Sequence, residues 1–339
     1  MLTSLQYPLV IADLHCDLLC YLSRDPRRTP FDRAVRCSIP QLREGHVKIQ
    51  TMAIFSETVL NSSLSGWKQA DMFRKLPVMY PDDFSLVRNA ENLNNFKEFK
   101  KIGIVAAIEN MSALCSEEDD LEKQLEKLTL FRKHTGNIMY LSLTWNTENR
   151  FGGGSLTNIG LKDDGKKVVD YLCDHNIALD LSHASDYLAY GLLDYIDRRG
   201  LKVSVLASHS NMRTITNFPR NLPDDIAKEI IKREGLIGIN FIRYLLGKES
   251  PNFFARHIEH LLVLGGANSM CFGADFFYPN DVAFGKSEDE LFFPSFDHAG
   301  TYPCMLNLLR TQLALPEVIM EDLCYNNVVR NLVKGWSLP

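Results

Sequence analysis

Short apolar runs alternate with longer amphipathic stretches along most of this chain. The runs are rich in β-branched and small residues, which is typical of strands buried on both faces of a parallel sheet. Eight of them are predicted as strands: 10–15, 48–55, 103–109, 138–145, 178–183, 203–209, 236–242 and 270–276. Five stretches between them have a helical period and are predicted as helices: 117–134, 163–175, 186–199, 223–233 and 252–264.

The regular alternation of strand and helix predicts parallel strands, and eight of them predict a (β/α)8 TIM barrel of the α/β class. An open, doubly wound sheet is the alternative, but that fold favours a glycine-rich phosphate-binding turn after its first strand. This chain has His15-Cys16-Asp17 there instead. Because no internal repeat or linker-like stretch interrupts the sequence, residues 1–339 are interpreted as a single barrel domain.

Polar side chains gather where the predicted strands end. Side chains alternate between the two faces of a strand, so His15 and Asp17 are expected to point the same way. Active sites of barrels lie at the carboxyl-terminal ends of the strands, where these residues would converge. The strand-end set is His15, Asp17, Glu109, Trp145, Asn146, His183, His209 and Asp275.

A metal centre is the best explanation for so many titratable groups in one place. Burying six of them without partners would be costly, and bound cations offset that cost. Imidazoles and carboxylates are typical ligands of Zn²⁺. A lone buried histidine is more often a core residue, but His183 and His209 end successive strands and face His15. Glu109 can bridge two ions, whereas Asp275 is open to three roles: ligand, general base or helix cap.

The remaining aspartates and histidines near the strands are given supporting roles. Asp13 and Asp180 lie one layer deeper than His15 and His183, where they are expected to orient the ligands. The other six histidines fall in helical or loop stretches and are interpreted as surface or packing residues: His46, His134, His175, His257, His260 and His298.

Composition narrows the class of protein. The chain is 45% hydrophobic and 23% charged, with a net charge of −5, which suits a soluble globular protein and argues against a nucleic-acid surface. No apolar segment approaches the ~20 residues needed to cross a bilayer. The first strand begins almost at once, leaving no room for a signal peptide, so a cytoplasmic location without a membrane anchor is expected. The eight cysteines lack a Cys-x-x-Cys pair, which favours reduced thiols.

Several of these residues belong to motifs that occur in order along nearly the whole chain. The motifs are His15-x-Asp17, Glu109, His183, Ala207-Ser208-His209-Ser210, Pro219-Arg220-Asn221-x-Pro223-Asp224-Asp225 and Gly273-x-Asp275-Phe276. With this order and placement, the chain resembles the membrane dipeptidase (renal dipeptidase) family of zinc peptidases. The resemblance implies a TIM barrel of the metal-dependent hydrolase type.

The resemblance also implies a binuclear zinc site, or one that holds two other divalent cations. His15, Asp17 and Glu109 would bind one ion, and Glu109, His183 and His209 would bind the other. Glu109 and a hydroxide would bridge the two ions, and this hydroxide would attack the amide carbonyl.

A catalytic cycle on dipeptides follows from the same resemblance. Glu109 and Asp275 would be the catalytic residues, with Asp275 accepting the proton of the water and delivering it to the leaving amine. Arg220 would pair with the free carboxylate of the dipeptide, a bidentate role that suits a guanidinium. The family tolerates a D-residue at the carboxyl-terminal position, and the resemblance suggests a homodimer.

The chain departs from the family pattern in two places. Animal members have a histidine after the Leu-Thr of strand four, whereas this chain has Trp145 and Asn146, which are expected to line the substrate site. Trp145 can donate an indole N–H but cannot titrate. An aspartate and a glycine usually follow the motif at Asp275-Phe276, whereas this chain has Phe277 and Tyr278. This change is expected to shift substrate preference toward apolar or aromatic side chains.

Other functions compete with a dipeptidase. Another metal-dependent amidohydrolase would act on N-acyl amino acids, lactams or cyclic amides. Deaminases and many related hydrolases have His-x-His on strand one and often a carboxylated lysine, whereas this chain has Asp17 and Glu109. A barrel that only stores or senses metal, or one that binds peptides without turnover, would leave Arg220 or Asp275 without a purpose.

Overall fold

A ring of parallel strands forms the centre of the computed structural model, which describes residues 8–95, 100–281 and 288–336. Neighbouring strands follow the order β7-β6-β5-β4-β2-β1-β9-β8. An isolated parallel bridge between Ala207 and Ile237 joins the two ends of this order. The ring consists of β1 (Ile11–Cys16), β2 (Val47–Phe55), β4 (Ile102–Glu109), β5 (Ile138–Ser142), β6 (Ala178–Asp180), β7 (Val205–Leu206), β8 (Ile237–Ile239) and β9 (Met270–Phe272). The predicted α/β TIM barrel is therefore confirmed.

All eight predicted strands are present, but the predicted ends of five are wrong. The predicted strand 138–145 ends at Ser142, and the strand predicted to reach His183 ends at Asp180. β7, β8 and β9 are similarly short. The chain leaves the sheet early at these points, and the apolar run continues into a buried loop that hydropathy cannot distinguish from a strand. One short strand, β3 (Phe84–Leu86), was not predicted and pairs with β4 outside the ring.

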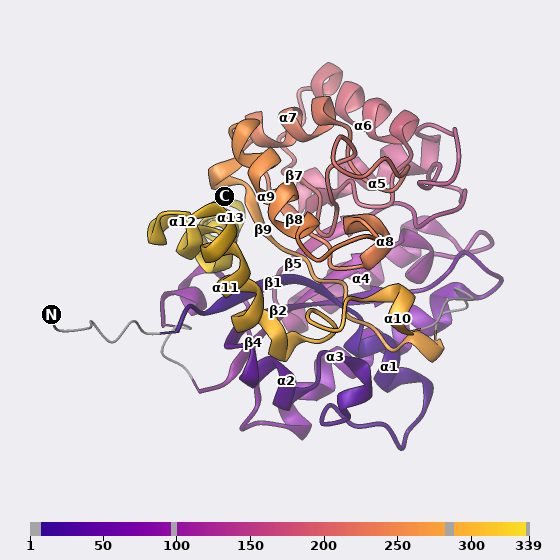
Figure 1. The fold of residues 1–339 in the computed structure, drawn as a ribbon. Coiled ribbons are helices and arrows are strands. Elements are labelled where there is room, and N and C mark those ends of the chain that lie inside the picture. Colours follow the sequence, from indigo (N-terminus) through magenta and orange to yellow (C-terminus); the bar gives the residue numbers. More distant parts are fainter. Residues whose placement is uncertain (1–7, 96–99, 282–287, 337–339) are drawn as a thin grey trace, which may run out of the picture.

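Helices surround this ring (Figure 1). The five predicted helices are present as α4 (Leu121–Thr135), α5 (Asp163–Asp174), α6 (Asp186–Arg199), α7 (Asp224–Lys232) and α9 (Phe253–Val263). The start predicted for α4 is four residues early, because the carboxylate of Asp120 accepts the backbone N–H of Lys123 and caps the helix. The helices that were not predicted are α1 (Leu18–Arg24), α2 (Ile39–Glu44), α3 (Ser62–Met79), α8 (Arg243–Leu246), α10 (Glu288–Leu291), α11 (Tyr302–Leu313), α12 (Glu317–Glu321) and α13 (Asn327–Trp336).

The first strand and the last helices lie side by side, although they are far apart in sequence. Figure 1 shows α11 and α13 beside β1. Tyr302, at the start of α11, donates its hydroxyl to Asp13 of β1 at 2.5 Å. Asp13 also accepts the backbone N–H groups of His15 and Ala274, at 3.0 and 3.1 Å. This buried carboxylate therefore joins β1, the chain after β9 and α11, directly behind the end of β1 that carries His15.

Two glycines allow the barrel to close tightly around Ser208. A Cβ atom on Gly273 would lie 1.9 Å from the carbonyl oxygen of Ser208, and one on Gly238 would lie 2.0 Å from it. Backbone cannot yield as a flexible side chain can, so only glycine fits at either position. The loop that carries His209 therefore depends on both glycines for its position.

A Gly273→Ala protein is expected to be less stable than the parent by about 1–3 kcal/mol, the usual cost of forcing extra atoms into a packed core. Urea unfolding followed by circular dichroism measures this difference. Gly335→Ala is the matched control, because a Cβ at Gly335 in α13 meets nothing within 4 Å. Equal midpoints for the parent and Gly273→Ala would contradict the tight closure.

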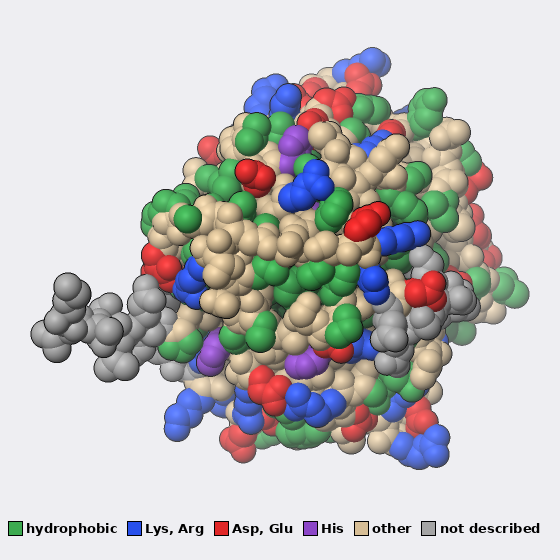
Figure 2. Space-filling view, in the orientation of Figure 1, with side chains coloured by type: hydrophobic (Ala, Val, Ile, Leu, Met, Phe, Trp, Pro, Cys, Tyr) green, Lys and Arg blue, Asp and Glu red, His purple; other side chains and the backbone are tan. Residues whose placement is uncertain are grey.

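Charges of both signs lie on the surface, and the cysteines form no disulfide. On the face shown in Figure 2, basic and acidic side chains are interspersed among apolar ones. Within the described ranges, no helix has both the length and the apolar character that a membrane crossing requires. All eight cysteines fall in the described part of the chain, and each is a free thiol.

Candidate metal centre and substrate pocket

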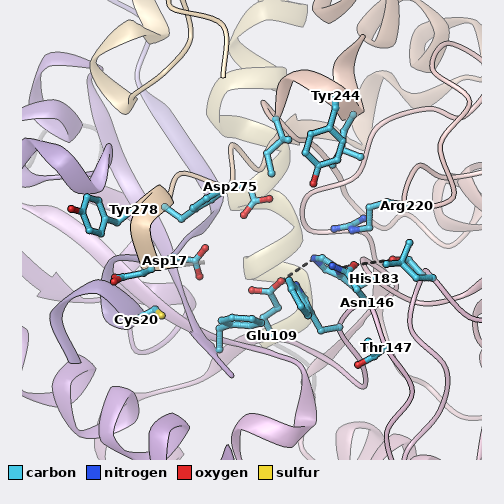
Figure 3. A pocket seen from close by; sticks show the side chains of 18 of the residues that line it. Asp17, Cys20, Glu109, Asn146, Thr147, His183, Arg220, Tyr244, Asp275 and Tyr278 are labelled. Carbon is cyan, nitrogen blue, oxygen red and sulfur yellow. Dashed lines mark hydrogen bonds and ion pairs between the residues drawn. The ribbon is translucent and has the colours of Figure 1, made fainter. Parts of the chain in front are cut away.

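A pocket of about 360 Å³ opens at the carboxyl-terminal ends of the ring strands. Its volume lies in the range of small-molecule binding sites, roughly 300–1,000 Å³. Asp17, Glu109, His183 and Asp275 reach it from four different strand ends (Figure 3). Arg220 lines its wall. Six of the eight predicted strand-end residues line this pocket, and the other two, His15 and His209, contact Glu109.

Glu109 lies at the centre of this cluster, close to all three histidines. It is the last residue of β4 and pairs in register with Phe55 of β2. Its Oε1 atom lies 2.9 Å from Nε2 of His183 and 3.6 Å from Nε2 of His209. Its Oε2 atom lies 3.3 Å from Nε2 of His15. One carboxylate therefore faces all three histidines, which permits it to be shared between two ions.

The orientation of His15 is fixed by a tyrosine that the sequence analysis missed. The hydroxyl of Tyr140, in β5, donates to the carbonyl of Leu14 at 2.9 Å. The same hydroxyl lies 2.7 Å from Nδ1 of His15. Because its proton is committed to Leu14, the hydroxyl accepts the Nδ1–H of His15. The lone pair of His15 is therefore on Nε2, the atom that faces Glu109.

A chain of hydrogen bonds from Asp180 through Ser208 fixes the orientation of His209. Asp180 accepts the hydroxyl of Ser208 at 2.6 Å and the backbone N–H of Ser208 at 2.8 Å. The Ser208 hydroxyl lies 2.6 Å from Nδ1 of His209 and accepts its N–H, because its own proton goes to Asp180. The lone pair of His209 is again on Nε2. Asp180 thus contacts the ligand set through Ser208.

His183 is held in the same tautomer by Asn146. The amide oxygen of Asn146 lies 2.9 Å from Nδ1 of His183 and also accepts the hydroxyl of Ser155 at 2.9 Å. His183 itself has a left-handed backbone, with a φ of 67°. This conformation is strained for a residue with a side chain and is typical of functional sites. Asn146 lines the pocket, but its oxygen is already committed to His183 and Ser155.

Three Nε2 lone pairs converge on one carboxylate, an arrangement that is suited to binding a cation. Nε2 of His183 lies 2.9 Å from Nε2 of His209, and no N–H remains to place between them in these tautomers. Nε2 of His15 and Oδ1 of Asp17 are buried without a hydrogen-bond partner among the described residues. Three groups have ligand atoms within 4.8 Å of one another: His15/Asp17/Glu109, Glu109/His183/His209 and His15/His209/Asp275. This mixture of imidazoles and carboxylates fits zinc or a similar divalent ion.

Burial and neighbouring charges shift the pKa values of the cluster in different directions. Burial alone lowers the pKa of His15, but the neighbouring Glu109 carboxylate outweighs burial and raises this pKa to about 10. Burial and the charge of Arg220 lower the pKa of His183 to about 3, so this imidazole stays neutral. Burial and the charge of Glu109 raise the pKa of Asp17 well above its ordinary value.

Asp275 lies at the edge of the cluster and is positioned by a second missed residue. Its Oδ1 is 3.6 Å from Nε2 of His15, and its Oδ2 accepts the amide of Asn240 at 2.8 Å. Like His183, it has a left-handed backbone, with a φ of 63°. Burial raises the pKa of Asp275 above its ordinary value. A carboxylate with one anchored oxygen and one free oxygen is suited to proton transfer.

Arg220 forms a buried cationic wall of the pocket. Its Nη1 donates to the hydroxyl of Ser210 at 2.7 Å, and its Nη2 donates to the carbonyl of His209 at 3.0 Å. Both partners are neutral, so the positive charge is not cancelled by a direct ion pair with a described carboxylate. Its Nε has no hydrogen-bond partner among the described residues. A buried guanidinium without a counter-ion is suited to an anionic ligand group.

The other sequence predictions fit this picture in part. Trp145 lines the pocket and packs against Phe55, with ring centroids 5.3 Å apart. His257 is buried as a packing residue, with Nδ1 accepting the backbone N–H of Met212 at 3.1 Å. Tyr140, which was missed, had a signal in the sequence, because it is a polar-tipped residue within a buried apolar strand. Asn240 had none.

Known proteins similar to this chain identify its family. A model of the membrane dipeptidase family (peptidase family M19) matches residues 2–332. The uncharacterized dipeptidase C965.12 of Schizosaccharomyces pombe is 25% identical over 264 residues, covering 70% of this chain and 59% of that protein. A second S. pombe dipeptidase, C3A11.10c, is 26% identical over 303 residues, covering 80% of this chain and 69% of that protein.

The fold is also shared with solved structures. A metallopeptidase from Rhodobacter sphaeroides, crystallised with a phosphinate mimic of L-Ala-D-Ala, superposes with a TM-score of 0.81 at 20% identity. The superposition covers 97% of this chain and 100% of that one. Because the family model spans nearly the whole sequence, the chain belongs to the membrane dipeptidase family, peptidase family M19.

Proposed function

We propose that this chain is a dipeptidase that depends on two divalent ions, with zinc as the preferred metal. The observation that carries the proposal is the convergence of three Nε2 lone pairs on Glu109, beneath a pocket that also presents a buried guanidinium. Membership of a dipeptidase family supports it, as does the dipeptide mimic bound by the R. sphaeroides relative.

Two groups of residues would hold the metals. His15, Asp17 and Glu109 form one group, and Glu109, His183 and His209 form the other. Ions held there would polarise the scissile carbonyl and lower the pKa of the attacking water toward neutrality.

The chain's own residues supply binding and proton transfer. Arg220 would bind the free carboxylate of the dipeptide, using a charge that Ser210 and the His209 carbonyl orient without neutralising it. Asp275, with Asn240 anchoring its Oδ2, would accept the proton of the attacking water through Oδ1 and return it to the leaving amine. Asn146 would orient His183, a role distinct from the predicted contact with substrate. A pocket of about 360 Å³ with one end fixed at Arg220 would limit substrates to dipeptides, including those with a C-terminal D-residue.

A Tyr140→Phe protein is expected to bind zinc about 10–100-fold more weakly than the parent, the usual effect of removing a residue that orients a metal-binding histidine. The change removes the acceptor of the His15 Nδ1–H and adds no bulk. Competition titration with a zinc-sensitive dye measures the affinity. Tyr195→Phe, which removes a hydroxyl that contacts Asp170 outside the pocket, is the matched control. Equal zinc affinities of the parent and Tyr140→Phe proteins would contradict the role of Tyr140 in orienting His15.

The proposed function is tested by metal analysis together with a substrate panel. The purified protein, loaded with zinc and dialysed, is expected to retain two equivalents of zinc and to hydrolyse L-Ala-D-Ala. Hydrolysis confined to N-acyl amino acids or cyclic amides would replace the dipeptidase with another amidohydrolase. Stable metal binding without any hydrolysis would indicate a storage or sensing protein. A homodimer and a cytoplasmic location stay predictions.

A further inference from the structure

We propose that the pocket selects dipeptides whose first, amino-terminal residue has a large apolar side chain. This inference rests on the proposed function and names a substrate class within it. The side chain would be held by four aromatic residues, here called the aromatic wall: Tyr21, Phe55, Phe277 and Tyr278.

The aromatic wall and Arg220 come from different parts of the ring. Phe55 ends β2, Tyr21 follows β1, and Phe277 and Tyr278 follow β9, three strands that are neighbours in the ring. Arg220 follows β7, which lies four strands from β2 in one direction and, through β8, two strands from β9 in the other. Figure 3 shows Tyr278 and Arg220 on opposite sides of the pocket, with Glu109 and Asp275 between them. A dipeptide with its carboxylate at Arg220 and its amide above Glu109 therefore extends its first residue toward the aromatic wall.

The rings of the aromatic wall are packed against neighbouring side chains. The rings of Tyr21 and Tyr278 meet edge to face, with centroids 5.3 Å apart. The guanidinium of Arg28 lies 4.3 Å from the Tyr21 ring centroid and 5.0 Å from that of Tyr278. Phe277 packs against Phe292 at 5.5 Å. A preformed apolar surface loses little conformational entropy on binding, which favours tight recognition of an apolar group.

The charges near the aromatic wall do not favour a basic or acidic first residue. Asp281 lines the same side of the pocket, but Arg28 donates to both of its carboxylate oxygens, at 2.5 and 2.9 Å. Arg24 also donates to its backbone carbonyl at 2.5 Å. Asp17 faces the metal cluster instead. Among the described lining residues, this sector therefore presents apolar rings and a neutralised carboxylate.

A substrate series with D-alanine as the second residue tests this preference. Because one methylene in an apolar pocket is worth about 10–200-fold in kcat/KM, L-Phe-D-Ala is expected to exceed L-Ala-D-Ala by at least tenfold. L-Leu-D-Ala is expected to lie between them, and L-Lys-D-Ala and L-Asp-D-Ala below L-Ala-D-Ala. An equal or reversed order would overturn the inference.

Two variants assign the preference to the aromatic wall. Tyr278→Ala removes one ring of the wall, and the ratio of kcat/KM for the phenylalanine and alanine substrates is expected to fall severalfold. Tyr187→Ala removes an exposed tyrosine of α6 that does not line the pocket, so the ratio is expected to stay at the parent value. The inference fails if both variants keep the parent ratio.

A binding measurement separates failure of the inference from failure of the proposed function. Phosphinate mimics of L-Phe-D-Ala and L-Ala-D-Ala are titrated calorimetrically into the zinc-loaded parent and Tyr278→Ala proteins. If the parent binds the phenylalanine mimic more tightly than the alanine mimic and Tyr278→Ala does not, the role of the aromatic wall is supported. This holds even if no dipeptide is hydrolysed and the proposed function fails. Equal binding of both mimics to the parent, with dipeptides still hydrolysed, would overturn the inference and leave the dipeptidase intact.

Discussion

A Glu109→Gln protein is expected to bind less than two equivalents of zinc and to lose dipeptide hydrolysis almost completely. Among the described carboxylates, Glu109 alone faces all three histidines, at 2.9–3.6 Å from their Nε2 atoms. The amide keeps the size of the side chain but removes its negative charge and turns one acceptor into a donor. The loss of activity should therefore exceed the ~10–100-fold that follows from removing a residue that only orients a ligand.

The measurements for Glu109→Gln are zinc content by elemental analysis and kcat/KM for L-Ala-D-Ala. Far-ultraviolet circular dichroism checks that the barrel is folded. Glu259→Gln is the matched control, because Glu259 is exposed on α9. Two retained zinc ions together with parent activity would contradict the shared role of Glu109.

An Asp275→Asn protein is expected to keep both zinc ions and to lose about 10²–10⁴-fold in kcat, the usual contribution of a positioned acid–base group. An amide cannot accept the proton of the attacking water. Asparagine tolerates a left-handed backbone well, so the φ of 63° at this position should not disturb the fold. The change therefore separates proton transfer from metal binding.

Zinc content and steady-state kinetics on the same Asp275→Asn preparation test this separation. Loss of one zinc ion would indicate that Asp275 is a metal ligand, as its place in the group with His15 and His209 permits. Parent kcat with full zinc content would exclude Asp275 as the general base. Either result would redirect the proposed mechanism without changing the fold.

Strain in the backbone accompanies the chemistry at this site. His183 and Asp275 have φ values of 67° and 63°, and such conformations cost of order 1–3 kcal/mol each in residues other than glycine. A hydrogen bond with Asn146 holds the imidazole of His183 in place, and one with Asn240 holds the carboxylate of Asp275. The protein thus maintains two strained turns to direct an imidazole and a carboxylate into the same pocket.

The barrel, the number of ring strands and the residues that meet at the strand ends could all be predicted from the order of residues along the chain. Apolar runs and helical periods are local properties, so the eight ring strands and five of the helices could be predicted from them. α3 was missed because its apolar positions follow no clear helical stripe and Pro77 lies within it. The ends of the short strands were misplaced because a buried loop is as apolar as a strand.

The nitrogen of each histidine that faces the candidate metal site can be identified only in the folded protein. That choice depends on partners distant in sequence, such as Tyr140 for His15 and Asp180 acting through Ser208 on His209. The contact of Asn146 with His183 and the ion pair of Arg28 with Asp281 likewise appear only in the folded protein. Hydrogen bonds of this kind depend on distances of about 3 Å between atoms brought together by folding. No pattern along the chain records those distances, because they exist only after the barrel has closed.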